Sequence, residues 1–161
     1  MTVEEYNTAV NRYADGVFRF VLKNLRDEEK SRDVVQDSFE KLWLHRDRLA
    51  AEKAKPYLYT TAYHRLIDLI RKDSRLRLID DHHPMEDVHF EQYSDLGEVL
   101  DRAVKLLPDD QRMALMLRDY EGYSYKEIGE ITGLSEAQVK VYIYRARVFL
   151  KNYIGKIDVL V

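Results

Sequence analysis

The chain has 161 residues, with 26 Lys and Arg against 29 Asp and Glu, so its formal charge is −3 and one domain or two small ones are expected. It contains no cysteine, which excludes a disulfide framework and a thiolate metal site. No apolar stretch is long enough to span a bilayer, and the polar start (Glu4, Glu5, Asn7) is unlike a signal peptide, so we expect a cytoplasmic protein without membrane insertion.

Apolar residues recur at helical spacing in the first part of the chain and predict two helices. The first keeps one face apolar through Tyr6, Val10, Tyr13, Val17, Val21 and Leu25. Asp27, followed by two glutamates, suits the start of the second helix, because negative charge there meets the positive end of the helix dipole. The buried stripe of that helix consists of Val35, Phe39 and Leu42, with Trp43 beside it.

A loop over Arg46 to Lys55 is expected to precede a third helix. Pro56 opens this helix, because a proline in the first turn loses no hydrogen bond. Its inner face, formed by Ala62, Leu66, Leu69 and Ile70, extends to about Lys72. The following segment, Asp73 to Ser94, lacks periodicity and contains Pro84, so we interpret it as a mostly irregular linker.

Charge is unevenly distributed around this linker. Five basic residues lie between His64 and Arg77, whereas Leu78 to Glu98 holds seven acidic residues and no Lys or Arg. An autonomous DNA-binding domain is usually basic overall. We therefore expect weak affinity for DNA alone and a partner that assembles the complex.

Helical patterns resume at Leu96. One helix is predicted from Leu96 to Leu107, and Pro108 with Asp109 and Asp110 starts another that ends near Gly122. No alternating run suggests a strand. The prediction is an all-α protein with two small helical domains, residues 1–74 and 96–161, joined by an acidic linker at 75–95.

The most informative segment is Tyr123 to Leu150, which contains the start signals of two successive helices. Ser124 with Glu127, and Ser135 with Gln138, each have the spacing of a capping box. An apolar residue before each cap pairs with one inside the helix, Tyr123 with Ile128 and Leu134 with Val139, as in a hydrophobic staple. Gly133 suits the left-handed end of the first helix. Together these signals predict a helix-turn-helix.

The second of these helices has an apolar back and a basic front. Val139, Ile143, Ala146 and Leu150 recur at helical spacing and are expected to face inward. The opposite side presents Lys140, Val141, Tyr144, Arg145 and Val148, with Arg147 and Lys151 on the flanks. A helix that reads DNA in the major groove needs this division of its surface.

Two surfaces of the first half are also candidates for binding. Asp33, Gln36, Asp37 and Glu40 share one polar face of the second helix, which by spacing alone is a solvated face. On the third helix, tyrosines alternate with cations: Lys55, Tyr57, Tyr59, Tyr63, His64, Arg65, Arg71 and Lys72. Rings amid positive charge suit single-stranded nucleic acid. We assign Tyr57 to packing and regard Tyr59 and Tyr63 as the stacking candidates.

The order of these motifs resembles a known family. Asp33-Val-Val-Gln-Asp-Ser-Phe, Trp43, Tyr57-Leu-Tyr and Arg65-Leu-Ile-Asp-Leu-Ile-Arg-Lys resemble region 2 of an extracytoplasmic-function (ECF) sigma factor. Leu107-Pro108, Glu121-Gly-Tyr-Ser-Tyr-Lys-Glu-Ile-Gly, Gly133-Leu-Ser and Val139-Lys-Val-Tyr-Ile-Tyr-Arg-Ala-Arg resemble region 4. Both halves match in order, across roughly Tyr6 to Lys151.

The resemblance implies a role in transcription initiation and a binding partner for each surface. Asp33, Gln36 and Asp37 would dock on the clamp helices of the largest subunit of core RNA polymerase. The loop Arg46 to Lys55 and the third helix, with Lys55, Tyr59, Tyr63, His64, Arg65, Arg71 and Lys72, would read and open the minus-ten element. Lys140, Val141, Tyr144 and Arg145 would enter the major groove at the minus-thirty-five element, with Arg147 nearer the phosphates. The acidic linker resembles the family's connector in the polymerase channel, and an anti-sigma factor is an implied partner.

Two residues depart from the family's pattern. His64 stands where the family often has asparagine, and Val141 replaces an often polar residue, so it can touch a thymine methyl but cannot donate a hydrogen bond. The promoter sequence therefore cannot be carried over from relatives.

Three other functions remain open. One is a self-sufficient helix-turn-helix regulator that binds duplex DNA as a dimer, although the acidic charge and the lack of a dimerisation motif count against it. An enzyme would have to use His82, His83 and nearby carboxylates, which lie in the linker and suit a solvated tether better than a metal site. The third is an inactive homologue that titrates polymerase. We expect no catalytic residues, metal or cofactor.

Overall fold

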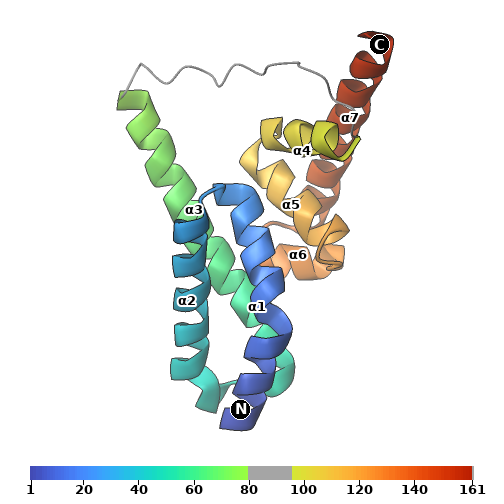
Figure 1. Ribbon diagram of the computed structural model, residues 1–161. Coiled ribbons are helices and arrows are strands. Elements are labelled where there is room, and N and C mark those ends of the chain that lie inside the picture. The colour runs from blue at the N-terminus through green and yellow to red at the C-terminus, as the bar shows by residue number, and fades with distance from the viewer. Residues whose placement is uncertain (80–95, 161) are drawn as a thin grey trace.

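The computed structural model describes residues 1–79 and 96–160, and this part of the chain is helical without a strand. Its elements, in order, are α1 (Val3–Leu25), α2 (Glu28–His45), η1 (Arg46–Arg48), η2 (Ala51–Lys53), α3 (Ala54–Ile79), α4 (Leu96–Leu106), α5 (Asp109–Asp119), α6 (Tyr125–Thr132) and α7 (Glu136–Leu160). Figure 1 shows two groups of helices side by side, α1 to α3 and α4 to α7. The predicted all-α fold with two helical domains is confirmed.

The N-terminal group is a bundle in which α1, α2 and α3 all contact one another. Its core contains Val17, Phe20, Val21, Val34, Leu42, Leu58 and Leu66, each no more than 1% exposed. Burying one such side chain contributes about 1.5–3 kcal/mol relative to leaving it in water. Asp27 caps α2 as predicted, since its Oδ1 accepts a hydrogen bond from the amide of Lys30 over 3.0 Å.

The C-terminal group is built around α5, which contacts α6, α7 and also α1. Five consecutive residues of α5, from Met113 to Leu117, are buried. A helix buried on all sides in this way is the centre of its domain. The buried apolar residues of both groups form one contiguous cluster, so the two domains share a packed boundary.

The helix α3 is longer than the sequence pattern predicts. It begins at Ala54, two residues before Pro56, and continues to Ile79 instead of ending near Lys72. Pro56 is tolerated as the third helical residue because amides of the first turn need no intrahelical partner. Residues 73–76 are all exposed, so no buried stripe marks this turn of α3 and periodicity did not predict it. The first turns of the expected linker are therefore helical.

Within residues 1–79 and 96–160, no helix is both long and apolar enough to cross a membrane. In the same residues, His, Asp and Glu side chains nowhere gather in threes at a place suited to a metal ion. The pair His82 and His83 and most of the acidic linker lie outside the described residues.

Candidate nucleic-acid and polymerase interfaces

The helix-turn-helix is formed by α6 and α7, and both predicted capping boxes are present. Ser124 Oγ accepts from the amide of Glu127 over 3.1 Å, and Glu127 Oε1 accepts from the amide of Ser124 over 3.0 Å. Ser135 and Gln138 repeat this pair of bonds at 3.1 and 3.0 Å. Gly133 ends α6 with a φ of +80°, a left-handed conformation that glycine adopts without strain. The predicted helix-turn-helix is confirmed.

The exposed side of α7 carries the side chains predicted for the major groove. Val139, Ile143 and Ala146 are buried against the domain, as their spacing predicts. On the opposite side, Tyr144 is 70% exposed and Val141 44%, and Lys140 and Arg145 are exposed as well. Lys140 Nζ lies 3.7 Å from Glu136 Oε1, one turn earlier. This surface is open to a duplex although the two domains are packed together.

Arg147 lies at the flank of this surface and is engaged within its own domain. Its Nη2 donates to Asp119 Oδ1 of α5 over 2.8 Å, and the side chain remains half exposed. This hydrogen bond and the negative charge of Asp119 raise the pKa of the Arg147 guanidinium. A phosphate would have to share or displace Asp119, so a phosphate contact of Arg147 stays a prediction.

The polar face of α2 is also accessible. Asp33 and Gln36 are exposed, and Asp37 is half-buried. The nearest cation to Asp37 is Arg65 of α3, whose Nε lies 3.9 Å from Asp37 Oδ2. Both side chains of this pair are about half exposed (47% and 48%), so the pair is a weak surface interaction. Among the described residues, the C-terminal domain packs on α1 and α3, and Asp33 and Gln36 of α2 stay exposed.

Tyr59 and Tyr63 of α3 lie at the boundary between the domains and are buried, although we expected both to be free for stacking. Tyr59 is 2% and Tyr63 7% exposed, whereas Tyr57 is partly buried and packs against the core, as we predicted. Tyr57 Oη lies 3.2 Å from His45 Nδ1 near the end of α2. Burial raises the pKa values of Tyr59 and Tyr63. With the domains packed in this way, neither buried ring can stack on a base, so their proposed role requires the domains to separate.

The partner of Tyr59 is Glu121, which follows α5 in the other domain. Tyr59 Oη donates to Glu121 Oε2 over 2.7 Å, and the ring packs edge-on against Tyr123, with centroids 5.2 Å apart. Arg19 of α1 binds the same carboxylate with its Nη2, at 3.1 and 3.2 Å, and with its Nε at 3.3 Å. The Glu121 side chain is only 5% exposed. Sequence reasoning missed these roles of Glu121 and Arg19.

The rest of the α3 surface is basic and open. His64, Arg65, Arg71 and Lys72 are exposed, and they lie on the part of α3 that the C-terminal domain does not cover. Lys55, at the start of α3, is partly buried, and its Nζ lies 4.7 Å from the centroid of the Tyr123 ring. The predicted minus-ten residues are therefore divided into an accessible cationic set and an occluded set that contains Lys55, Tyr59 and Tyr63.

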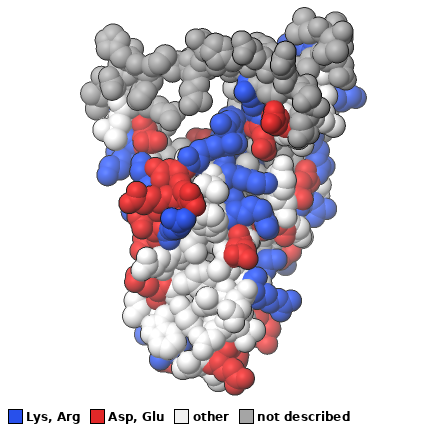
Figure 2. Space-filling view, in the orientation of Figure 1, with Lys and Arg blue, Asp and Glu red and all other residues white. Residues whose placement is uncertain are grey.

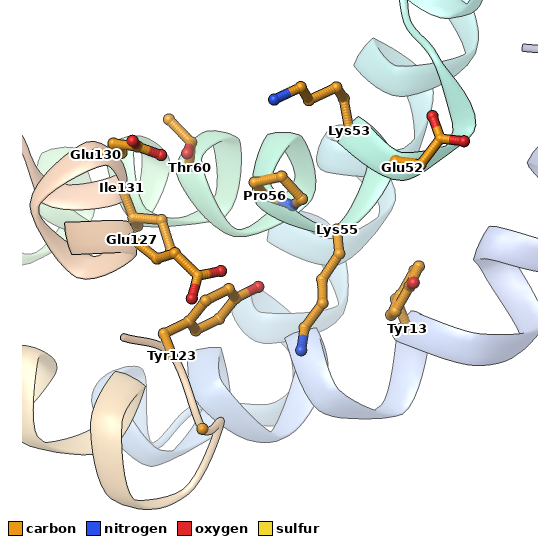
Figure 3. A pocket seen from close by; sticks show the side chains of 11 residues that line it. Tyr13, Glu52, Lys53, Lys55, Pro56, Thr60, Tyr123, Glu127, Glu130 and Ile131 are labelled. Atoms are coloured by element: carbon orange, nitrogen blue, oxygen red, sulfur yellow. The ribbon is translucent and has the colours of Figure 1, made fainter. Parts of the chain in front are cut away.

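A hollow of about 450 Å³ lies beside the occluded set, between the start of α3 and the turn before α6. Figure 3 shows Lys55 extending from α3 between Tyr13 of α1 and Tyr123, with Glu127 next to Tyr123. Lys53, Glu52 and Glu130 complete its charged rim. The hollow is lined by both positive and negative side chains, as is common at a boundary between domains. Its lining therefore does not favour one class of small ligand.

Basic side chains are concentrated at the boundary between the two domains. Figure 2 shows Lys and Arg gathered where α1 meets the C-terminal domain, and Asp and Glu gathered near the start of α2. Two of the α1 cations are used at this boundary: Arg19 binds Glu121, and Lys23 Nζ lies 3.6 Å from the centroid of the Tyr120 ring. Cations on one domain thus face acidic and aromatic groups on the other.

Two family models match the chain, one on each side of the linker. Residues 9–76 match sigma-70 region 2, and residues 97–150 match sigma-70 region 4. The chain is 30% identical over 162 residues to the ECF RNA polymerase sigma factor SigM of Bacillus subtilis, covering 94% of both chains. It is also 30% identical over 171 residues to the ECF sigma-E factor of Haemophilus influenzae, covering 92% of this chain and 87% of that one.

A solved structure has the same arrangement of helices. The sigma factor RpoE of Bartonella quintana, crystallised with the anti-sigma factor NepR, superimposes with a TM-score of 0.78. Its sequence is 25% identical, and the match covers 95% of this chain and 98% of that chain. With both region models matched in order and this similarity along nearly the whole length, the chain belongs to the ECF family of RNA polymerase sigma factors.

Proposed function

We propose that this sigma factor uses three separate surfaces to direct transcription initiation. Asp33, Gln36 and Asp37 of α2 dock on the clamp helices of core RNA polymerase. The basic side of α7 reads the minus-thirty-five element, and α3 with the preceding loop reads and opens the minus-ten element. The observation that carries the proposal is the exposed, basic and aromatic side of α7, mounted on a fully capped helix-turn-helix.

The minus-thirty-five surface has the chemistry needed for base recognition. Arg145 supplies the planar guanidinium that can bind guanine O6 and N7 together. Val141 supplies an apolar contact that fits a thymine methyl group. Lys140 and Arg147 add positive charge for the phosphate backbone, although both are paired with carboxylates in the free protein.

The minus-ten surface works in two stages in this proposal. Arg65, Arg71 and Lys72 attract the duplex through its phosphates, because they are accessible from the start. Tyr59 and Tyr63 offer stacking, worth about 1–3 kcal/mol per base, once they are uncovered. That energy offsets the few kcal/mol needed to take a base out of the stack.

The control and the cellular context are further parts of the proposal. An anti-sigma factor is a proposed partner, supported by the resemblance to RpoE of Bartonella quintana in its complex with NepR. We infer that the protein has no enzymatic activity of its own, since each surface serves binding. It is expected to act in the cytoplasm, where polymerase and promoter DNA are found.

Transcription with purified components tests the proposal. The protein should bind core RNA polymerase and produce run-off transcripts from fragments of its genome, and core polymerase alone should not. Gel shifts with the protein alone provide the contrast. Tight duplex binding without polymerase, together with no transcript from the mixture, would instead identify a self-sufficient regulator.

A further inference from the structure

The two domains are held together at one buried carboxylate. Glu121 leaves the end of α5 and places its side chain, 5% exposed, against the N-terminal bundle. There it accepts hydrogen bonds from Tyr59 Oη and from the Nε and Nη2 atoms of Arg19, at 2.7 to 3.3 Å. Hydrogen bonds with at least one charged partner are stronger than those between neutral groups. Glu121 therefore has three donor atoms, all from the other domain.

The N-terminal bundle is shaped to let this carboxylate approach. Gly16 of α1 faces the Tyr59 hydroxyl, and a Cβ atom added at Gly16 would lie 2.7 Å from Tyr59 Oη. Any larger residue at this position would push the hydroxyl away from Glu121. The space for the hydrogen bond thus depends on the absence of one side chain.

A second set of contacts joins α1 to α5 next to Glu121. Arg112 Nε donates to Asn24 Oδ1 over 2.8 Å, and Lys23 lies over the ring of Tyr120. These contacts are polar, and Arg19 and Lys23 keep part of their surface in water. Interfaces between domains of one chain resemble transient interfaces between proteins, and the domains are expected to move unless the interface is large and hydrophobic. Here the polar contacts lie beside the shared apolar cluster and make the packing of the two domains specific.

Domain packing covers only one of the three proposed surfaces. Tyr59 and Tyr63 are buried, whereas Asp33 and Gln36 on α2 and the basic side of α7 remain exposed. The packed protein can therefore meet polymerase and duplex DNA, but the two rings assigned to stacking, Tyr59 and Tyr63, are closed to an unpaired base.

We propose that Glu121 is an internal latch, and that domain closure and single-strand reading compete for the same surface of α3. This inference rests on the proposed function of α3 and adds its regulation. In the closed form, Glu121 holds Tyr59 through the hydroxyl and Arg19 through the guanidinium. Release of Glu121 exposes the tyrosines and leaves Arg19 free to contact a phosphate. Strand opening therefore requires that the two domains separate first.

The first experiment measures closure without DNA. The chain contains no cysteine, so cysteines introduced at Lys41 of α2 and Asn152 of α7, both exposed, can carry a fluorescent pair. Single-molecule energy transfer on the full chain should show one dominant, narrow population at the distance fixed by the packed domains. Glu121→Ala and Arg19→Ala should each raise the open population about tenfold or more. The double variant Arg19→Glu/Glu121→Arg should restore closure, and Glu98→Ala, an exposed glutamate on α4, should change nothing.

The second experiment measures single-strand binding by the free chain, with a random-sequence single-stranded oligonucleotide pool as the probe. Glu121→Ala should bind the pool about tenfold more tightly than the natural sequence, and adding Tyr59→Ala should remove most of that gain. Binding of duplex DNA to α7 should be the same in both variants.

An open population that Glu121→Ala leaves unchanged would overturn the latch, even if the natural protein transcribes with core polymerase. Opening without any gain in pool binding would overturn the competition. Failure of transcription with an intact latch would instead count against the proposed function alone.

Discussion

Arg147 of α7 and Asp119 of α5 are joined by a 2.8 Å hydrogen bond at the edge of the DNA-reading surface. The same guanidinium is proposed to contact a phosphate. The salt dependence of DNA binding can separate this role from the structural role of the pair with Asp119. If Arg147 reaches a phosphate, Arg147→Ala should reduce the slope of log affinity against log salt by about 1 for minus-thirty-five duplex bound by the holoenzyme. A purely structural role would lower the thermal midpoint and leave this slope unchanged.

Arg145 is the exposed cation best placed to read a base. Arg145→Ala should remove about 1–3 kcal/mol of discrimination between the preferred minus-thirty-five sequence and one with a guanine replaced. Competition binding with matched duplexes measures this difference. Lys151→Ala, a flanking cation on the same helix, is the control and should weaken all duplexes equally. Selectivity that survives Arg145→Ala would refute the base contact.

Asp37 tests the polymerase-docking surface. Asp37→Lys should abolish binding to core RNA polymerase while leaving the fold intact, because its only described ion pair, with Arg65, is half exposed and worth about 0–1 kcal/mol. Pull-down with core polymerase and circular dichroism measure the two effects. Asp68→Lys, an exposed aspartate on α3, should keep polymerase binding. Normal assembly of the Asp37 variant would remove α2 from the interface.

Gly16 offers a test of the latch through shape alone. Alanine is favoured over glycine inside a helix by about 0.5–1 kcal/mol, so Gly16→Ala should not weaken α1 itself. Its methyl group would displace Tyr59 Oη, however, and the open population should rise. Gly155→Ala in α7 is the matched control, because nothing lies within 4 Å of its added Cβ atom. It should stabilise the protein slightly without opening it.

The capping box of α6 predicts a dependence of stability on pH. Hydrogen bonds from the backbone and side chain of Ser124 lower the pKa of Glu127 from its usual value of 4.5. The charged form is therefore favoured in the folded state, so its contribution is complete above 4.5 and is lost as the pH falls through the lowered pKa. Glu127→Gln should cost about 0.3–1 kcal/mol at neutral pH. Urea unfolding at a series of pH values should show the difference shrinking as the pH falls below 4.5; a constant difference would contradict the assignment.

Local signals in the sequence were sufficient for the helix-turn-helix. Ser124, Ser135 and Gly133 act within one or two turns of themselves, so their spacing fixes the structure without knowledge of the rest of the chain. The inward positions of α7 were predicted for the same reason, because a three-to-four residue period identifies a buried face.

The boundary between the domains could not be predicted in this way. Tyr59 and Glu121 are 62 residues apart, and no local pattern links them. An aromatic ring among cations suits both a stacking surface and a packed boundary, so the burial of Tyr59 became visible only when the second domain was in place. Glu121 lies between two helices, where periodicity carries no information. The continuation of α3 beyond Lys72 was missed because residues 73–76 are exposed, so no buried stripe marks the helix there.

The length of α7 has a mechanical consequence. Its 25 residues form one helix from Glu136 to Leu160, about 37 Å long, with the base-reading side chains near its beginning. Such a helix moves as a stiff rod. A protein that bound its C-terminal end, around Tyr153 and Lys156, would therefore change the orientation of Val141 and Arg145 in the groove without touching the DNA.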